Sequence, residues 1–133
     1  MSTARLFTIT TVLTIGAFVA WVVKGVVIAL AGGLGQSPLE GPLFIIGLLL
    51  YVLGVAAIGL AVTVGRSTGV RVLGVVAAVA IGVLVTLGLD AIVASIEPAD
   101  PHWVWEEAQL WIVSGATALG WLAWRNRTAQ VPA

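Results

Sequence analysis

The chain has 133 residues, of which 60% are hydrophobic and only 9% are charged, and its mean hydropathy is +1.14. A soluble domain of ordinary composition carries about 25% charged residues, so this composition indicates a membrane protein. Six Lys and Arg residues balance six Asp and Glu residues, and there is no cysteine. We therefore expect no nucleic-acid partner, no disulfide and no thiolate metal site.

Four segments are long and apolar enough to be expected as membrane helices, which need about 20 predominantly apolar residues each. They cover residues 6–31, 43–64, 70–96 and 104–124. Glycine, proline and polar residues separate them, most clearly Pro98 and Pro101 before the last segment. The sequence thus predicts an all-α integral membrane protein, a four-transmembrane-helix bundle in which residues 1–133 form a single domain.

The basic residues predict the orientation of this bundle. On a four-pass path every arginine falls on one side of the membrane and most acidic residues fall on the other, where the loops contain no Lys or Arg. Because Lys and Arg are enriched in cytoplasmic loops, we expect both termini to be cytoplasmic in a plasma membrane. The arginines are Arg5, Arg66, Arg71, Arg125 and Arg127.

The first segment contains a run of threonines and one lysine. Threonine hydroxyls can bond to their own helix backbone, so a threonine-lined polar path is the less favoured interpretation. Lys24 lies 18 residues after Leu6, about 27 Å along a helix, which is close to the outer boundary of a hydrocarbon layer about 30 Å thick. Its long side chain can extend to the headgroups at that height. The threonines are Thr8, Thr10, Thr11 and Thr14.

The third segment carries small residues at four-residue spacing, Gly74, Ala78 and Gly82. Small residues let membrane helices approach closely, so this ridge is the predicted helix-packing face, within the chain or between copies. Asp90, on the same segment, lies about 30 Å from Val70 and thus near the same boundary as Lys24.

Tryptophans flank both ends of the fourth segment: Trp103 and Trp105 at one end, Trp121 and Trp124 at the other. Indole rings prefer membrane interfaces, so we interpret them as anchors, with a tryptophan-lined binding site as the alternative.

An outer charged cluster is the candidate site. Lys24 is the only cation at a level that holds several carboxylates, and an ion pair between Lys24 and Asp90 is the first hypothesis, with Glu106 or Glu107 as alternative partners. The members of the predicted cluster are Lys24, Asp90, Glu97, Glu106 and Glu107.

The sequence contains no motif for catalysis or for a cofactor. The helix centres hold no ionisable residue, no histidine pair is available for haem, and no glycine run follows a strand. A cation site of Asp100, His102 and Glu106 matches no established ligand pattern. We therefore predict a protein that is not an enzyme and has no cofactor or metal.

The expected function is that of a non-catalytic subunit or accessory protein in the lipid bilayer, packed against other membrane subunits or against itself. The first alternative is a small oligomeric transporter or channel that uses the outer cluster. A second alternative, an enzyme acting on lipid, requires Asp90, His102 and Glu106 or Glu107 to converge.

Overall fold

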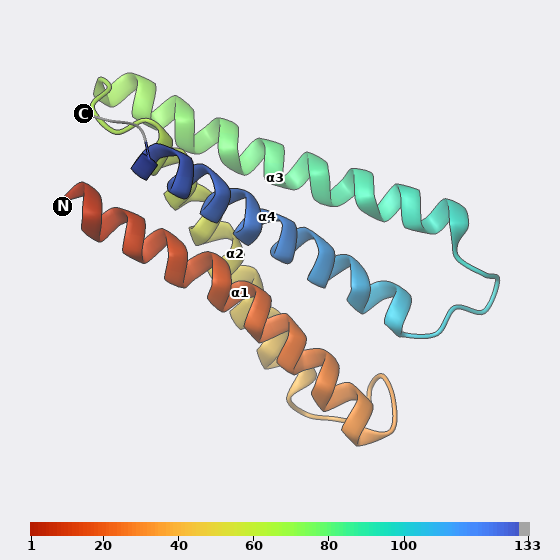
Figure 1. Ribbon diagram of the computed structural model, residues 1–133. Coiled ribbons are helices and arrows are strands. Elements are labelled where there is room, and N and C mark those ends of the chain that lie inside the picture. The colour runs from red at the N-terminus through yellow and green to blue at the C-terminus, as the bar shows by residue number, and fades with distance from the viewer. Residues whose placement is uncertain (131–133) are drawn as a thin grey trace.

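The computed structural model describes residues 1–130 and contains four consecutive helices, with no strand among those residues. They are α1 (Thr3–Ala31), α2 (Glu40–Val62), α3 (Thr68–Ile96) and α4 (Val104–Gln130), and neighbours in sequence run antiparallel (Figure 1). The predicted boundaries differ from these by no more than one turn, except that α4 continues beyond residue 124 to Gln130.

Polar and glycine residues set the helix ends. The Ser2 hydroxyl accepts a hydrogen bond from the Arg5 backbone N–H at 3.2 Å and caps α1, and Ser67 caps α3 in the same way through Val70. Gly32 ends α1 with φ of 94°, a left-handed conformation that glycine adopts without steric cost.

Three of the four helices, α1, α2 and α3, are long and apolar enough to cross a membrane. Helix α4, predicted as a fourth span, does not qualify as a candidate span by length and composition. The reason is its composition, because Glu106, Glu107, Gln109 and Arg125 interrupt its apolar residues.

The tightest part of the bundle is formed by α1, which packs against both α2 and α4. Gly54 of α2 allows this approach, since a Cβ there would lie 3.3 Å from the Thr14 backbone nitrogen. A core cluster joins the three helices at mid-height, and a second cluster of Leu6, Ala61 and Trp121 joins them nearer the N-terminus. The core cluster consists of Ala17, Trp21, Tyr51, Val55 and Val113.

Helix α3 lies on the outside of the bundle (Figure 1). It contacts α2 and, over a smaller area, α4, and Val93 is its one buried residue. Its closest approach to α2 is at Gly74, where a Cβ on Gly59 would lie 2.5 Å from the Gly74 carbonyl oxygen. Of the predicted packing face, Gly74 thus faces α2, Ala78 packs on the core cluster, and Gly82 faces Val55 at van der Waals distance.

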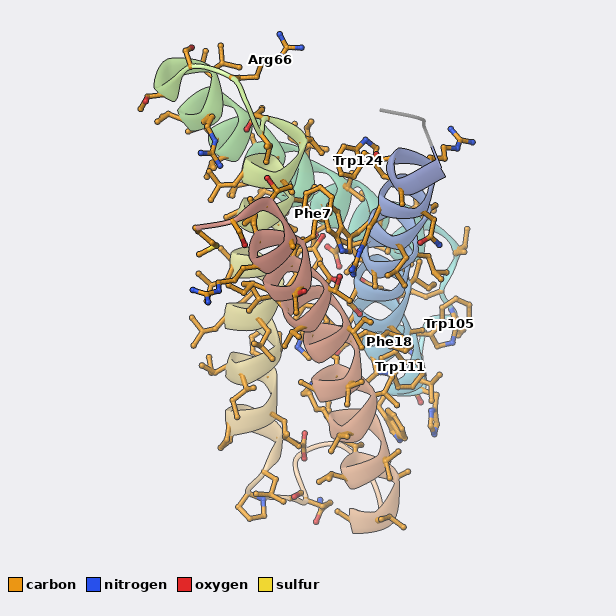
Figure 2. The ribbon with its side chains drawn as sticks, turned by 60° about the vertical axis from the view of Figure 1, so that its left-hand side comes forward. Phe7, Phe18, Arg66, Trp105, Trp111 and Trp124 are labelled. Atoms are coloured by element: carbon orange, nitrogen blue, oxygen red, sulfur yellow. The ribbon has the colours of Figure 1, made fainter. Side chains whose placement is uncertain are left out.

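The antiparallel order gathers the arginines at one end of the bundle. The start of α1 and the end of α4 lie together there (Figure 1), and Figure 2 shows Phe7 and Trp124 at that end, with Arg66 pointing away from the helices. We call it the arginine end. Most acidic residues are at the opposite end, which we call the acidic end.

Candidate functional site

A buried ion pair between α1 and α4 is the main charged feature of the acidic half of the bundle. The Lys24 ammonium nitrogen lies 2.5 Å from Glu107 Oε1, and only 10% and 3% of the two side chains are exposed. It is the one ion pair that the structure records within residues 1–130. The first hypothesis, a pair between Lys24 and Asp90, is wrong, and the alternative partner Glu107 takes its place.

The helix arrangement explains this choice of partner. Lys24 belongs to α1, which packs against α4 and makes no comparable contact with α3, the helix of Asp90. Asp90 is exposed on the surface of α3. Glu106 precedes Glu107 by one residue and is therefore rotated by about 100° around α4, where it is exposed.

Phe44 contacts the ion pair, and two tryptophans hydrogen-bond to backbone carbonyls of the neighbouring helices. The Lys24 ammonium lies 5.5 Å from the centroid of the Phe44 ring, within the range of a cation–π interaction. The Trp111 indole donates a hydrogen bond to the Trp21 carbonyl at 2.9 Å, and the Trp21 indole donates to the Phe44 carbonyl at 3.3 Å. Gly25 makes room for Trp111, because a Cβ on Gly25 would lie 2.3 Å from that ring.

One carboxylate oxygen of Glu107 remains without a partner. Oε2 is buried, and no group among residues 1–130 donates a hydrogen bond to it. Glu107 lies in the first turn of α4, where the partial positive charge of the helix N-terminus favours a carboxylate. The pair is therefore neutral overall but retains one unused acceptor.

The other members of the predicted cluster do not join Lys24. Asp90 and Glu106 are exposed, and Glu97 is half-buried at the end of α3. His102 is exposed, and its Nδ1 accepts a hydrogen bond from the Val104 backbone N–H. In the described part of the chain no three His, Asp or Glu side chains are grouped to hold a metal ion, so the alternative site of Asp100, His102 and Glu106 is not assembled.

A second polar cluster, which the sequence did not suggest, lies toward the arginine end. The Thr11 hydroxyl accepts hydrogen bonds from the Trp121 indole at 2.9 Å and from the Arg125 guanidinium at 2.8 Å. Trp121, predicted as an interfacial anchor, is only 2% exposed. The spacing of Trp121 and Arg125, four residues apart, was a usable signal because such residues share one helix face.

The threonines of α1 otherwise behave as expected, since Thr8, Thr10, Thr11 and Thr14 each donate a hydrogen bond to the carbonyl one turn earlier.

An apolar crevice of about 220 Å³ separates α2 from α3. Trp21, Phe44 and Tyr51 line one side, and Val79 and Val83 line the other. The crevice offers contact area for an apolar group, and its lining contains no charged side chain.

The arrangement thus contains a buried ion pair beside the Phe44 ring, and near it an apolar crevice. Both features suit helix packing and the binding of apolar groups. Comparisons with protein-family models, with curated proteins and with solved structures give no match for this chain.

Proposed function

We propose that this chain is a non-catalytic subunit of a larger membrane assembly, and that it packs against another transmembrane helix through α3. The observation that carries this proposal is the exposed carboxylate of Asp90 on an otherwise apolar helix surface.

Asp90 lies within a band of exposed apolar residues on α3, and this band continues on both sides of it. Leu87 precedes it, and Ile92 and Ile96 follow it, each of them at least 60% exposed. Six helical residues, about 9 Å, separate Asp90 from the end of α3. A carboxylate facing lipid is unfavourable, by about 2.5–3.5 kcal/mol at mid-membrane on insertion scales and less near the boundary. A partner helix with a Lys, Arg or hydrogen-bond donor at this height would remove that cost.

The attachment of α3 supports the same proposal. None of the side-chain hydrogen bonds within residues 1–130 joins α3 to another helix, whereas α4 makes four with α1. Gly88 of α3 and Gly120 of α4 face open space, since a Cβ on either would meet no atom within 4 Å. Open glycines of this kind allow the backbone of a partner helix to approach closely.

We further propose that all four helices cross a plasma membrane, with both termini in the cytoplasm. The arginine end would then be cytoplasmic, in agreement with the positive-inside rule. The composition of α4 does not oppose this, because Glu107 is paired with Lys24 and Arg125 is bound to Thr11 inside the bundle. Reporter fusions at the two termini test the orientation, and reports from opposite sides would refute it.

Site-specific photo-crosslinking tests the subunit role. A photoreactive amino acid at Ala91, beside Asp90, is expected to give one discrete protein adduct in native membranes, and Asp90→Asn is expected to weaken it. The matched control is Val19, an exposed residue of α1. The mass of the adduct distinguishes another subunit from a second copy of this chain. Lipid adducts alone at residue 91, or the same protein adduct at residue 19, would overturn the proposal.

The second candidate function is a small oligomeric transporter or channel, and the unpaired Oε2 of Glu107 favours it. A buried carboxylate oxygen with a free acceptor is what a transported cation or proton would use. In reconstituted vesicles, transport predicts an ion or proton flux that Glu107→Gln abolishes and that Glu106→Gln leaves unchanged. Equal leakage from protein-free vesicles and from vesicles with the wild-type chain would exclude this function.

A further inference from the structure

The basic side chains of this protein differ in how their charge is satisfied. Lys24 is paired with Glu107, and Arg125 donates to Thr11. Arg66 is exposed, as are Arg5 and Arg127. Arg71 is different, because its side chain is half-buried and its Nε is buried without an acceptor among residues 1–130.

Arg71 lines a hollow between α2 and α3 at the arginine end. This Arg71 hollow has a volume of about 340 Å³. Thr68 and Arg71 lie in the first turn of α3. Val75 and Val76 lie about one turn deeper, about 6–7.5 Å along the helix from Arg71. The hollow is therefore polar beside the N-terminus of α3 and apolar one turn further along the helix. It is lined by Leu60, Thr68, Arg71, Val72, Val75 and Val76.

The hollow opens sideways, toward the surroundings of the bundle, because Val72 and Val76 are 56% and 60% exposed. On its inner side it adjoins the tight contact between α2 and α3, where Val75 lies against Gly59. A ligand thus enters from the membrane side and does not pass between the helices.

An anion is the favoured partner for the Arg71 guanidinium. No Asp or Glu occurs between Glu40 and Asp90, and every acidic residue lies in or beyond the acidic half of the helices. A guanidinium presents a planar fork of N–H donors that matches two oxygens of a phosphate. Basic pockets between helices at the cytoplasmic side of membrane proteins bind anionic headgroups for this reason.

We propose that the Arg71 hollow binds an anionic phospholipid, with the phosphate on the Arg71 guanidinium and an acyl chain along Leu60, Val72 and Val76. The lipid supplies an anionic partner for the Arg71 guanidinium and fills the apolar part of the hollow in one molecule. This binding does not depend on the proposed subunit role, because it uses the opposite end of α3 from Asp90.

Lipid retention measured by native mass spectrometry tests the site. The full chain is reconstituted into nanodiscs of equal amounts of phosphatidylglycerol and phosphatidylcholine and then released into detergent. We expect the wild-type chain to retain phosphatidylglycerol preferentially and Arg71→Gln to weaken that retention roughly tenfold. The matched control is Arg66→Gln, which removes the same charge from an exposed position at the same end and is expected to behave as wild type.

A second pair of variants keeps the test decisive if Arg71→Gln does not fold. Val76→Trp fills the apolar part of the hollow and leaves Arg71 in place, so it is expected to displace the lipid. Leu73→Trp adds the same ring on α3 at a residue that does not line the hollow and is expected to have no effect.

Inorganic phosphate distinguishes a lipid from a free anion. The lipid proposal predicts that millimolar phosphate leaves the retained phosphatidylglycerol in place, because it cannot replace the acyl contacts. Displacement of the lipid by phosphate would show that the site binds a free anion and would overturn the proposal. Equal retention of the two phospholipids, or equal loss from Arg71→Gln and Arg66→Gln, would overturn it as well.

Discussion

The buried pair of Lys24 and Glu107 gives the sharpest stability prediction. Glu107→Gln preserves the shape of the side chain and removes its charge, so the Lys24 ammonium stays in an enclosure where only 10% of its side chain reaches solvent. Removing one partner of a buried ion pair typically costs about 3–5 kcal/mol, because the remaining charge is uncompensated. The Phe44 ring offsets about 1–2 kcal/mol of that at most, through its cation–π contact. We therefore expect Glu107→Gln to lower the free energy of unfolding by about 2–4 kcal/mol.

A double-mutant cycle isolates the interaction. Lys24→Met alone leaves the Glu107 carboxylate buried and unpaired and is expected to cost a similar amount. In Lys24→Met/Glu107→Gln no charge remains, so we expect the double variant to be more stable than either single variant, with a coupling energy of about 2–3 kcal/mol. The free energies are measured by reversible unfolding in mixed detergent micelles with increasing denaturing detergent.

Glu106→Gln is the matched control. It makes the same chemical change one residue away on the exposed face of α4, and it is expected to change the free energy of unfolding by less than about 0.5 kcal/mol. If Glu107→Gln and Glu106→Gln were equally stable, or if the cycle gave no coupling, the pair would not hold α1 to α4 and the reasoning would be wrong.

Three further substitutions test the packing, each by the same unfolding measurement. Gly47→Ala is expected to destabilise the chain by about 1–3 kcal/mol, because its Cβ would lie 2.2 Å from Nε1 of the buried Trp21 ring. Gly59→Ala is expected to cost at least as much and to loosen α3 in hydrogen exchange, since the new methyl group meets the Gly74 backbone, which has no rotamer to change. Thr11→Val is expected to cost about 1–3 kcal/mol, because it leaves two side-chain donors of α4 without their acceptor. The matched controls, at open or exposed positions and expected to be near neutral, are Gly120→Ala, Gly41→Ala and Thr8→Val.

The helix boundaries could be predicted from the sequence because local signals determine them. The helix ends follow from the lengths of the apolar segments, from Pro98 and Pro101, and from the glycines after residue 31. Ser2 and Ser67 cap the N-termini of α1 and α3. The nature of α4 could not be judged from its apolar residues alone. Glu107 and Arg125 bond to α1 whereas Glu106 is exposed, and this division depends on the packing of the bundle and not on α4 itself.

The partner of Lys24 shows the limit of counting residues along a helix. A rise of about 1.5 Å per residue gives the height of Lys24 correctly and puts Asp90 and Glu107 at a comparable level. The position of a residue along the helix axis does not determine which helices are neighbours. In this bundle α1 packs against α4 and not against α3. Choosing between Glu106 and Glu107 also requires the rotation of α4, which is fixed by buried residues such as Val113 and Trp121.

The polar contacts divide the bundle into a firmly joined part and a loosely held helix. Toward the acidic end Glu107 joins α4 to α1, and toward the arginine end Arg125 and Trp121 do the same through Thr11. Helix α3 has no such contact within the described residues, and its closest fit is the glycine crossing with α2. The free energy that fixes α3 therefore comes mostly from van der Waals contacts with α2 and α4, and contacts with lipid can replace part of it. A partner that binds Asp90 at one end of α3, or a phospholipid that binds Arg71 at the other, would consequently set the position of α3 with little opposition from the rest of the bundle.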